Sequence, residues 1–327
     1  MTTVLPFKIA VKSSSRFLFA LVTLVGLAGG LCSAKAASAY VIIDAQTGAV
    51  LQSQEPRQKR QIGSVTKIAT AMVVLDWAEK KGGNLAAVAT IPPEAFVGTT
   101  ENNIGFQPGD TVELRDLMYA ALVQSDNIAA YTLANHVGST LQSLVPAASK
   151  KGTPVSVFVS QMNALAIQLR MEKTRFSNPH GIDQNVKPMP YSSAEDVARL
   201  TRYAMNRASF RFYVSQKERQ ISFQRGNRKM NYLLRNTNEL LGTHGIDGVK
   251  TGRTTRAGDC LVLSAVRDPQ LVWMNADQAK VYPRRIIVVL LGSTNRFGEG
   301  EALVEKGWQL YDQWAAAGRP IDPKKQI

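Results

Sequence analysis

The stretch GSVTKIAT, residues 63–70, decides how the rest of the chain is interpreted. It places Ser64 three residues before Lys67, at the start of the segment GSVTKIATAMVVLDWAEKKGG, whose apolar residues have helical spacing. Residues three apart in a helix are neighbours on one face. We therefore expect Ser64 at the N-cap or in the first turn of a helix that the glycine pair ends, with Lys67 beside it.

This serine and lysine could form a nucleophile with its own base. A serine hydroxyl is a weak nucleophile unless a base within hydrogen-bond reach takes its proton. Lys67 could be that base only if its pKa is lowered, and burial near another cation would lower it. A capping serine followed by a solvated lysine is the plainer alternative, and the spacing alone does not decide between the two.

Two further short motifs favour the catalytic interpretation. SDN at 125–127 falls at the predicted break between two helices, VELRDLMYAALVQ and DNIAAYTLANHVG, where a loop can present side chains to a cleft. KTG at 250–252 lies in a predicted strand, and Gly252 would let a substrate backbone approach closely. SxxK, SxN and KTG in this order are typical of β-lactamases and penicillin-binding proteins.

The order of the predicted elements indicates an α+β fold. Strand-like runs occur near both ends of the chain, helical patterns lie between them, and Ser193 is placed to cap one of these helices. We expect an antiparallel sheet assembled from both ends, flanked by helices, with an inserted helical subdomain. The strand-like runs are 39–54, 219–224, 245–252, 260–266 and 284–293. Helices are expected at 155–169 and 301–318. Residues 268–285 are expected to form a strand with a longer loop.

The first 39 residues resemble an export signal. A basic start precedes the apolar run FLFALVTLVGLAGG, and AKAASA offers cleavage after Ala36 or Ala39. The run is short for a membrane span, so an uncleaved anchor is the weaker alternative. We expect an extracytoplasmic protein, in the periplasm or cell wall space, with a catalytic domain at 40–318 and a short tail at 319–327 without a second domain.

Charge and cysteine content narrow the class of partner. The net charge of +14 falls to about +10 without the four basic residues of the signal, which would attract polyanions or an anionic wall or membrane surface. Nucleic acid is disfavoured because the basic residues are scattered and the chain is expected to be exported. If Cys32 is removed with the signal, Cys260 is the remaining cysteine, so we expect no internal disulfide and a buried, inert thiol. The sequence has three histidines, and we expect no metal or cofactor.

Beyond the three motifs, the chain resembles the serine-type D-alanyl-D-alanine carboxypeptidases, low-molecular-mass penicillin-binding proteins of peptidase family S11. The resemblance implies a β-lactamase/transpeptidase-like fold. It also implies peptidoglycan stem peptides ending in D-Ala-D-Ala as substrate, and β-lactam antibiotics as covalent inhibitors. The resembling blocks cover most of residues 39–293: AYVIIDAQTGAVL, GSVTKIATAMVVLD, LMYAALVQSDNIAAYTLA, TRFSNPHGID, YSSAEDVARL, RNTNELL and GIDGVKTGRTTRAGDCLV.

By this resemblance, three residues carry the chemistry. Ser64 is the nucleophile that forms an acyl-enzyme, and Lys67 is the general base. Ser125 is the hydroxyl that passes the proton toward the leaving amine.

The same resemblance implies a set of substrate-binding residues. Asn127 would bind the substrate's peptide and steady Lys67, Lys250 would keep Lys67 deprotonated, and Thr251, beside Gly252, would bind the terminal carboxylate. The backbone N–H of Arg253, with that of Ser64, would form the oxyanion hole. Arg235 and Arg253 are both left as candidates for the arginine that meets the carboxylate, since Thr237 occupies the position where some family members carry one.

Three other functions remain as alternatives. A DD-endopeptidase that cuts peptidoglycan crosslinks would use the same acyl chemistry. A β-lactamase is less favoured because TRFSNPHGID lacks the glutamate of an ExxLN loop, and His180 is expected to be a structural turn residue. A non-catalytic wall-binding protein would not need the complete set of Ser64, Lys67 and Ser125.

Overall fold

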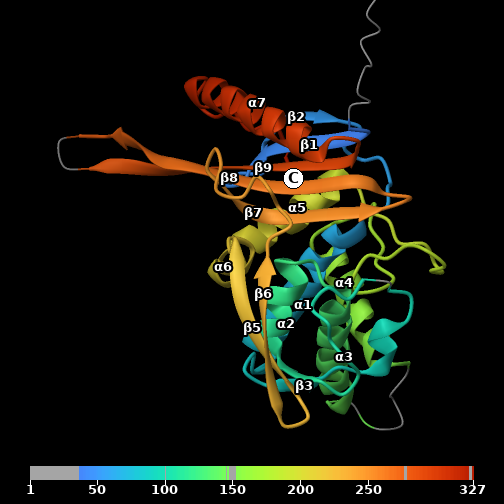
Figure 1. Cartoon of the computed structure of the whole chain (residues 1–327). Helices are drawn as coiled ribbons and strands as arrows, with labels where there is room; N and C mark the ends of the chain where they lie inside the picture. Colours follow the sequence, from blue (N-terminus) through green and yellow to red (C-terminus); the bar gives the residue numbers. More distant parts are fainter. Residues whose placement is uncertain (1–36, 100, 145, 147–151, 276–277, 324–325) are drawn as a thin grey trace, which may run out of the picture. The chain divides into compact units, whose positions relative to one another are not determined.

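A computed structural model describes residues 37–99, 101–144, 146, 152–275, 278–323 and 326–327 (Figure 1). The export segment up to Ala36, including Cys32, lies outside the described residues. Among the helices of the described chain, none is long and apolar enough to cross a membrane.

A five-stranded antiparallel sheet is built from both ends of the chain, which confirms the predicted α+β arrangement. The strand order is β2-β1-β9-β8-β7, so β7 is an edge strand and only one of its two sides is paired with another strand of this sheet. The strands are β1 (Ala39–Asp44), β2 (Val50–Gln54), β7 (Ile246–Thr254), β8 (Gly258–Trp273) and β9 (Ala279–Ser293).

Helices cover both faces of this sheet (Figure 1). On one face, Leu263 and Val288 belong to an apolar cluster with Trp308 of α7 (Arg296–Ala316). On the other face, Val262 and Val289 join the larger core, which includes α5 (Ala194–Met205). Alternate residues of each strand therefore serve two different cores, as the two-residue period of a strand requires.

The middle of the chain forms the predicted helical subdomain around α1 (Lys67–Lys81). Ten residues of α1 are buried, on every side of the helix, as expected for a helix that runs through a core. Gly82, in the left-handed region at φ 67°, ends it. The other helical elements are η1 (Gly63–Thr66), η2 (Pro93–Phe96), α2 (Leu114–Leu122), α3 (Asn127–Ser143), α4 (Pro154–Gln168) and α6 (Ala208–Val214).

A second sheet was not predicted. Its order is β3-β4-β5-β6, formed by β3 (Val88–Thr90), β4 (Thr111–Glu113), β5 (Glu218–Arg225) and β6 (Arg228–Arg235). The run at 219–224 was expected in the same sheet as the other strands, and that prediction was wrong. A strand's period shows which residues face a core, but it does not show which sheet the strand joins.

Within 268–275 and 278–285, β8 and β9 form the outer part of a long hairpin, where a strand with a longer loop was expected. β8 and β9 remain paired as far as Trp273 and Ala279, well beyond the last pairing of β7, at Ala265. Figure 1 shows this hairpin projecting from the sheet. A bulge between Arg267 and Gln270 interrupts the alternation of residues, which is why the sequence pattern did not indicate a continuous strand.

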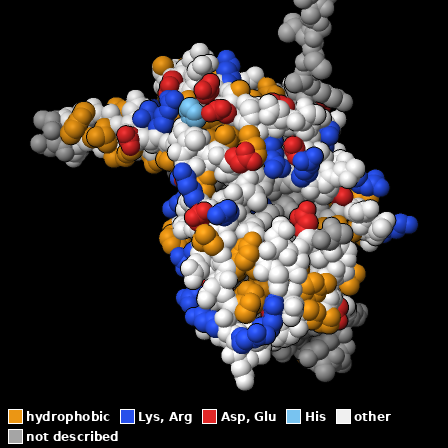
Figure 2. Space-filling model, viewed as in Figure 1, with side chains coloured by type: hydrophobic (Ala, Val, Ile, Leu, Met, Phe, Trp, Pro, Cys, Tyr) orange, Lys and Arg blue, Asp and Glu red, His pale blue; other side chains and the backbone are white. Residues whose placement is uncertain are grey.

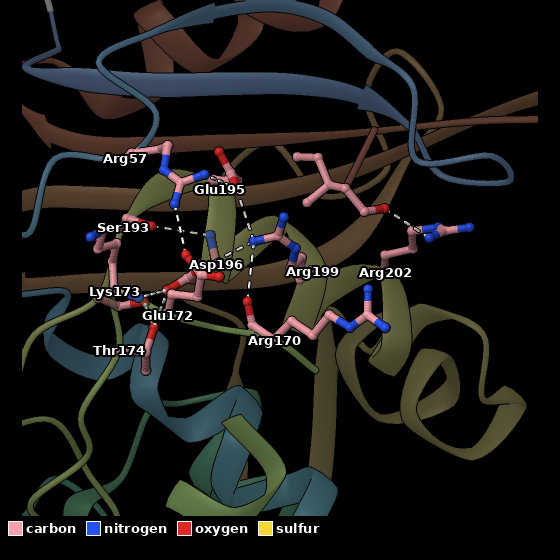
Figure 3. A network of polar contacts seen from close by, with 12 residues as sticks. Arg57, Arg170, Glu172, Lys173, Thr174, Ser193, Glu195, Asp196, Arg199 and Arg202 are labelled. Atoms are coloured by element: carbon pink, nitrogen blue, oxygen red, sulfur yellow. Dashed lines mark hydrogen bonds and ion pairs between the residues drawn. The ribbon is translucent and has the colours of Figure 1, made fainter. Parts of the chain in front are cut away.

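A polar network fixes the loop between α4 and α5 to the start of α5 (Figure 3). The buried carboxylate of Asp196 accepts hydrogen bonds from the Lys173 nitrogen (2.7 Å) and the Thr174 hydroxyl (2.8 Å), and it pairs with Arg199. Ser193 Oγ accepts from the Asp196 nitrogen at 3.2 Å, which confirms the predicted cap. The same loop carries His180, whose carbonyl oxygen accepts a hydrogen bond from Lys67 Nζ.

Cys260 is the free cysteine of the described residues and lies buried in β8. Burial raises the pKa of its thiol to about 11. A thiol that stays protonated is a poor nucleophile, so the prediction of an inert buried cysteine is confirmed.

Candidate active site

Ser64 lies in the 3₁₀ turn η1, immediately before α1. Its side chain forms no helix cap, and Thr66 occupies the N-cap position of α1, so the N-cap expectation is replaced by a place in the turn that leads into the helix. Lys67 Nζ lies 2.8 Å from Ser64 Oγ, which confirms that the two side chains meet.

Lys67 is fully buried, with polar partners only at its tip. Nζ lies 2.7 Å from Asn127 Oδ1 and 3.1 Å from the His180 carbonyl oxygen, in addition to Ser64. Burial lowers the pKa of Lys67 to about 7, while the negative charges of Asp126 and then Glu101 raise it. A neutral amine here can donate its two hydrogens to Asn127 and His180, which leaves its lone pair for the Ser64 hydroxyl.

Lys250 is also buried, and its Nζ donates to the Thr251 carbonyl oxygen at 3.2 Å. Burial, then the charge of Lys67 and then that of Arg296, lower the pKa of Lys250 well below its ordinary value. Lys250 was expected to keep Lys67 deprotonated, but what lowers the pKa of Lys67 is its own burial. Because repulsion between two ammonium groups is mutual, the pair still resists holding two protons at once.

The predicted break between two helices is present at residues 123–126, between α2 and α3. Ser125 has φ 67°, the left-handed region that few residues other than glycine adopt. Asp126 caps α3, because its Oδ1 accepts from the Ala129 nitrogen at 2.7 Å, and burial raises its pKa to about 6. Strained backbone is common at functional sites, where the surrounding structure holds it in place.

Three glycines allow the active-site segments to approach one another. A Cβ on Gly252 would lie 2.5 Å from the Ile62 carbonyl oxygen, one on Gly63 would lie 3.0 Å from the Arg253 nitrogen, and one on Gly181 would lie 1.9 Å from the carbonyl oxygen of Gly63. Gly252 was expected to make room for a substrate. It lines the cleft, and its missing Cβ also makes room for Ile62 and Val65, which brings β7 alongside Ser64.

His180 supports the site through its backbone. Burial and the charge of Lys67 lower the pKa of its ring to about 3, so the ring is neutral at pH 7. The ring Nδ1 accepts a hydrogen bond from the Ile182 nitrogen at 3.2 Å, while the carbonyl oxygen accepts from Lys67. The expectation of a structural turn residue therefore describes the ring, and the contact with Lys67 was missed.

These segments surround a cleft of about 620 Å³. Its lining includes most of the predicted site residues, whereas Lys67 and Lys250 are buried behind its wall. Within the described residues, no three His, Cys, Asp or Glu side chains are grouped as metal ligands. The predicted residues that line the cleft are Ser64, Ser125, Asn127, Thr251, Gly252 and Arg253.

Both arginines that are candidates for binding the substrate carboxylate line the cleft, and their equal exposure does not favour one over the other. The side chains of Arg235 and Arg253 are each 77% exposed, and each pairs with a carboxylate near its own strand. Thr237 also lines the cleft, with its Oγ1 2.7 Å from Oγ1 of Thr251. The two hydroxyls form a paired polar group beside the edge of β7.

Arg296 is a cleft residue that sequence reasoning missed. It lies at the start of α7, lines the cleft, and its guanidinium is 3.4 Å from both the Gly252 carbonyl oxygen and the Asp259 carboxylate. No local motif marks it, because α7 is distant in sequence from the three motifs. Glu101 and Tyr232 line the cleft and were missed for the same reason, whereas Gln124 directly precedes the SDN motif and was overlooked.

Comparison with known proteins agrees with this geometry. A family model described as D-alanyl-D-alanine carboxypeptidase, peptidase S11, matches residues 31–277. The chain is 30% identical over 272 residues to D-alanyl-D-alanine carboxypeptidase DacD of Salmonella typhimurium, covering 81% of this chain and 60% of that protein. It is 32% identical over 235 residues to a D-alanyl-D-alanine endopeptidase of Pseudomonas aeruginosa, covering 70% of this chain and 66% of that protein.

Solved structures show the same fold. The Streptomyces K15 DD-transpeptidase superposes with a TM-score of 0.69 at 27% identity, covering 84% of this chain and 97% of that one. Penicillin binding protein 6B from Escherichia coli gives a TM-score of 0.63, covering 85% and 78% of the two chains. The chain spans about three fifths of the length of the two carboxypeptidases DacD and DacC that it matches.

Proposed function

The chain belongs to the peptidase S11 family of D-alanyl-D-alanine carboxypeptidases, and on this premise we propose that it removes the terminal D-Ala of peptidoglycan stem peptides through an acyl-serine intermediate. The observation that carries the proposal is the contact of Ser64 Oγ with Lys67 Nζ at 2.8 Å, in a site where the pKa of Lys67 is about 7. A general base works best when its pKa lies near the working pH.

In the first step, Ser64 Oγ attacks the carbonyl carbon of the penultimate D-Ala and its proton passes to Lys67. Asn127 and the His180 carbonyl accept the hydrogens of the neutral amine, so its lone pair is held toward Ser64 before substrate arrives. The backbone N–H groups of Ser64 and Arg253 are proposed to bind the oxygen that becomes negative. The close packing of Gly63 against the Arg253 nitrogen supports this pairing.

In the second step, the tetrahedral intermediate collapses and the C–N bond breaks. The leaving amine must receive a proton, and Ser125 is proposed to pass it from Lys67, because its hydroxyl lines the cleft next to Asn127. Water then attacks the ester carbonyl with Lys67 as base, which releases the shortened peptide and restores Ser64.

Substrate is proposed to lie along the free edge of β7. An extended peptide can add to an exposed strand edge through backbone hydrogen bonds. The terminal carboxylate would then meet the paired hydroxyls of Thr237 and Thr251, in the positive field of Arg235, Arg253 and Arg296. Penicillins also carry a carboxylate beside the reactive carbonyl, so β-lactams are expected to acylate the same serine.

We place this activity outside the cytoplasm, because the export segment would deliver the chain to peptidoglycan. The basic side chains are spread over the visible face and not gathered in one groove (Figure 2). This distribution supports loose attraction to anionic wall or membrane surfaces more than a dedicated polyanion site.

Release of free D-Ala from a pentapeptide ending in D-Ala-D-Ala tests the proposal. Wild-type protein should release D-Ala and Ser64→Ala should release none. Ser38→Ala, which changes a serine just before β1 and outside the cleft, should keep the activity. No release by the wild type, or equal release by Ser64→Ala, would contradict the proposed function.

A DD-endopeptidase activity is the second candidate, because one of the relatives covering 70% of the chain is named an endopeptidase. The acyl chemistry is the same, and only the leaving amine differs. Digestion of crosslinked muropeptide dimers separates the two. Monomers formed from dimers at a rate matching or exceeding D-Ala release would favour the endopeptidase.

A further inference from the structure

The backbone nitrogen of Ala37 lies 2.6 Å from Oε2 of Glu299, in the first turn of α7. Ala37 is only 3% exposed, and its carbonyl oxygen accepts from the Gln54 side chain at 3.2 Å. The second carboxylate oxygen, Glu299 Oε1, accepts from Ser293 Oγ at 2.7 Å. Ala37 is therefore an integral part of the folded domain, although it lies within the segment expected to act as a signal.

We propose that a leader peptidase hydrolyses the Ala36–Ala37 bond, and that the new α-ammonium group of Ala37 pairs with Glu299. Water is the co-reactant: Ala36 ends the released leader as a carboxylate, and the nitrogen of Ala37 takes up protons to become an ammonium. A charged donor strengthens a hydrogen bond to a carboxylate. Cleavage would thus turn an ordinary amide contact into an ion pair that fixes the mature amino terminus.

The other expected position, after Ala39, fits the structure poorly. Ala39 is completely buried in β1 and pairs with Leu291 of β9. Ser38 Oγ donates to a backbone carbonyl of β9 at 3.3 Å. Cleavage there would remove Ala39 from the sheet, break the contact of Ser38 with β9, and leave Glu299 without the nitrogen of Ala37. Both positions carry small residues, so the sequence cannot choose between them, but the packing favours Ala36.

The processing site is tested by expressing the full chain with its own leader and determining the amino terminus and intact mass of the exported protein. We expect a chain that begins at Ala37. A chain that begins at Tyr40, or one that keeps the leader, would overturn the proposal.

The ion pair is tested separately with a thermodynamic cycle. Glu299→Gln is measured in a chain that begins at Ala37 and in one that begins at Ala34, where the ammonium is three residues away. Glu301→Gln, an exposed position of the same helix, is the control. We expect Glu299→Gln to lower Tm by about 2–4 °C more in the shorter chain. Equal losses in the two chains would overturn the pair.

A second inference comes from the uneven charges around the cleft. Four charged residues are among those that line the cleft. Arg235, Arg253 and Arg296 are positive, and Glu101 is negative. Glu101 also borders a small hollow with Ser125 and Asn127, next to the turn that carries the SDN motif. No ion pair joins Glu101 to another described residue, so the carboxylate is available to a ligand.

Resting on the proposed function, we infer that Glu101 binds an ammonium group of the substrate, on the side chain of a diamino acid that precedes D-Ala-D-Ala. The arginines and paired threonine hydroxyls attract the terminal carboxylate, and Glu101 offers the opposite charge beside the SDN turn. A peptide with a carboxylate at its end and an amine two residues earlier matches this distribution of charge. Because Glu101 is exposed, we expect a preference of only about two- to fivefold.

The test compares Lys-D-Ala-D-Ala peptides with a free and an acetylated ε-amine, together with two penicillins, one bearing a side-chain ammonium and one without it. Glu101→Gln should abolish the two- to fivefold preference for the charged member of each pair. Glu94→Gln, on the neighbouring η2, should retain it.

Glu101 also acts on the pKa of Lys67, but such an effect changes both members of a pair equally and leaves their ratio unaltered. An unchanged ratio in Glu101→Gln would overturn the inference. Normal acylation by penicillins without any D-Ala release would instead count against the proposed function, and the penicillin pair would still decide the role of Glu101.

Discussion

The pH dependence of acylation follows directly from the burial of Lys67. With a pKa of about 7, roughly half of the Lys67 side chains are neutral at pH 7. The neutral fraction is about one tenth at pH 6 and about one hundredth at pH 5. If neutral Lys67 is the base, the rate constant for acylation should rise with pH up to about 7, by as much as tenfold per unit, and level off above about 8.

Asp126 makes the expected curve less steep. Its pKa is about 6, and its negative charge raises that of Lys67. Protonation of Asp126 on going to lower pH therefore lowers the pKa of Lys67 and preserves part of the neutral fraction. Asp126→Asn removes the charge but keeps an oxygen that can accept from the Ala129 nitrogen. We expect this variant to reach its plateau at a lower pH than the wild type.

Stopped-flow acylation by a fluorescent penicillin between pH 5 and 9 measures this curve on the covalent step itself. The concentration must stay well below saturation so that the rate constant reports the free enzyme. A rate that is constant from pH 5 to 9, or one that still rises about tenfold between pH 8 and 9, would refute the lowered pKa of Lys67. A plateau at the same pH in Asp126→Asn would refute the effect of Asp126.

Three further substitutions test individual contacts. Gly252→Ala would put a Cβ 2.5 Å from the carbonyl oxygen of Ile62, just before η1, and should cut acylation by about 100-fold. Gly226→Ala, whose Cβ would meet nothing within 4 Å, should leave acylation unchanged. Thr251→Val should lower kcat/KM for D-Ala-D-Ala peptides by about 10- to 100-fold, which corresponds to the loss of a hydrogen bond to a charged group. A loss of less than twofold would argue against carboxylate binding at Thr251. Asp196→Ala should lower the free energy of unfolding by about 2 kcal/mol, because the Lys173 nitrogen and the Thr174 hydroxyl lose a buried acceptor. This loss would be measured as a fall in Tm of about 4–8 °C, and an unchanged Tm would contradict the role of this network.

Local patterns predicted most of the main elements. The helix after Ser64, the break before Asn127 and the strand containing Lys250 follow from residue periodicity and turn residues. The meeting of Ser64 and Lys67 follows from helix-like spacing alone, because an interaction between neighbours in sequence is encoded locally.

What sequence reasoning missed depends on long-range packing. Arg296 reaches the cleft from α7, and the His180 carbonyl reaches Lys67 from a loop 113 residues away in sequence. The contact between Gly252 and Ile62 was missed for the same reason, because no pattern near Gly252 indicates that neighbour. The second sheet was missed because β5 pairs with β4, about a hundred residues earlier.

The proposed reaction requires a covalent bond at Ser64. Intact-mass measurement after incubation with benzylpenicillin, followed by peptide mapping, tests it most directly. We expect one added penicilloyl group, located on the peptide that contains Ser64 and absent from Ser64→Ala. An unmodified wild-type protein, or a group of the same mass attached to another residue, would contradict it.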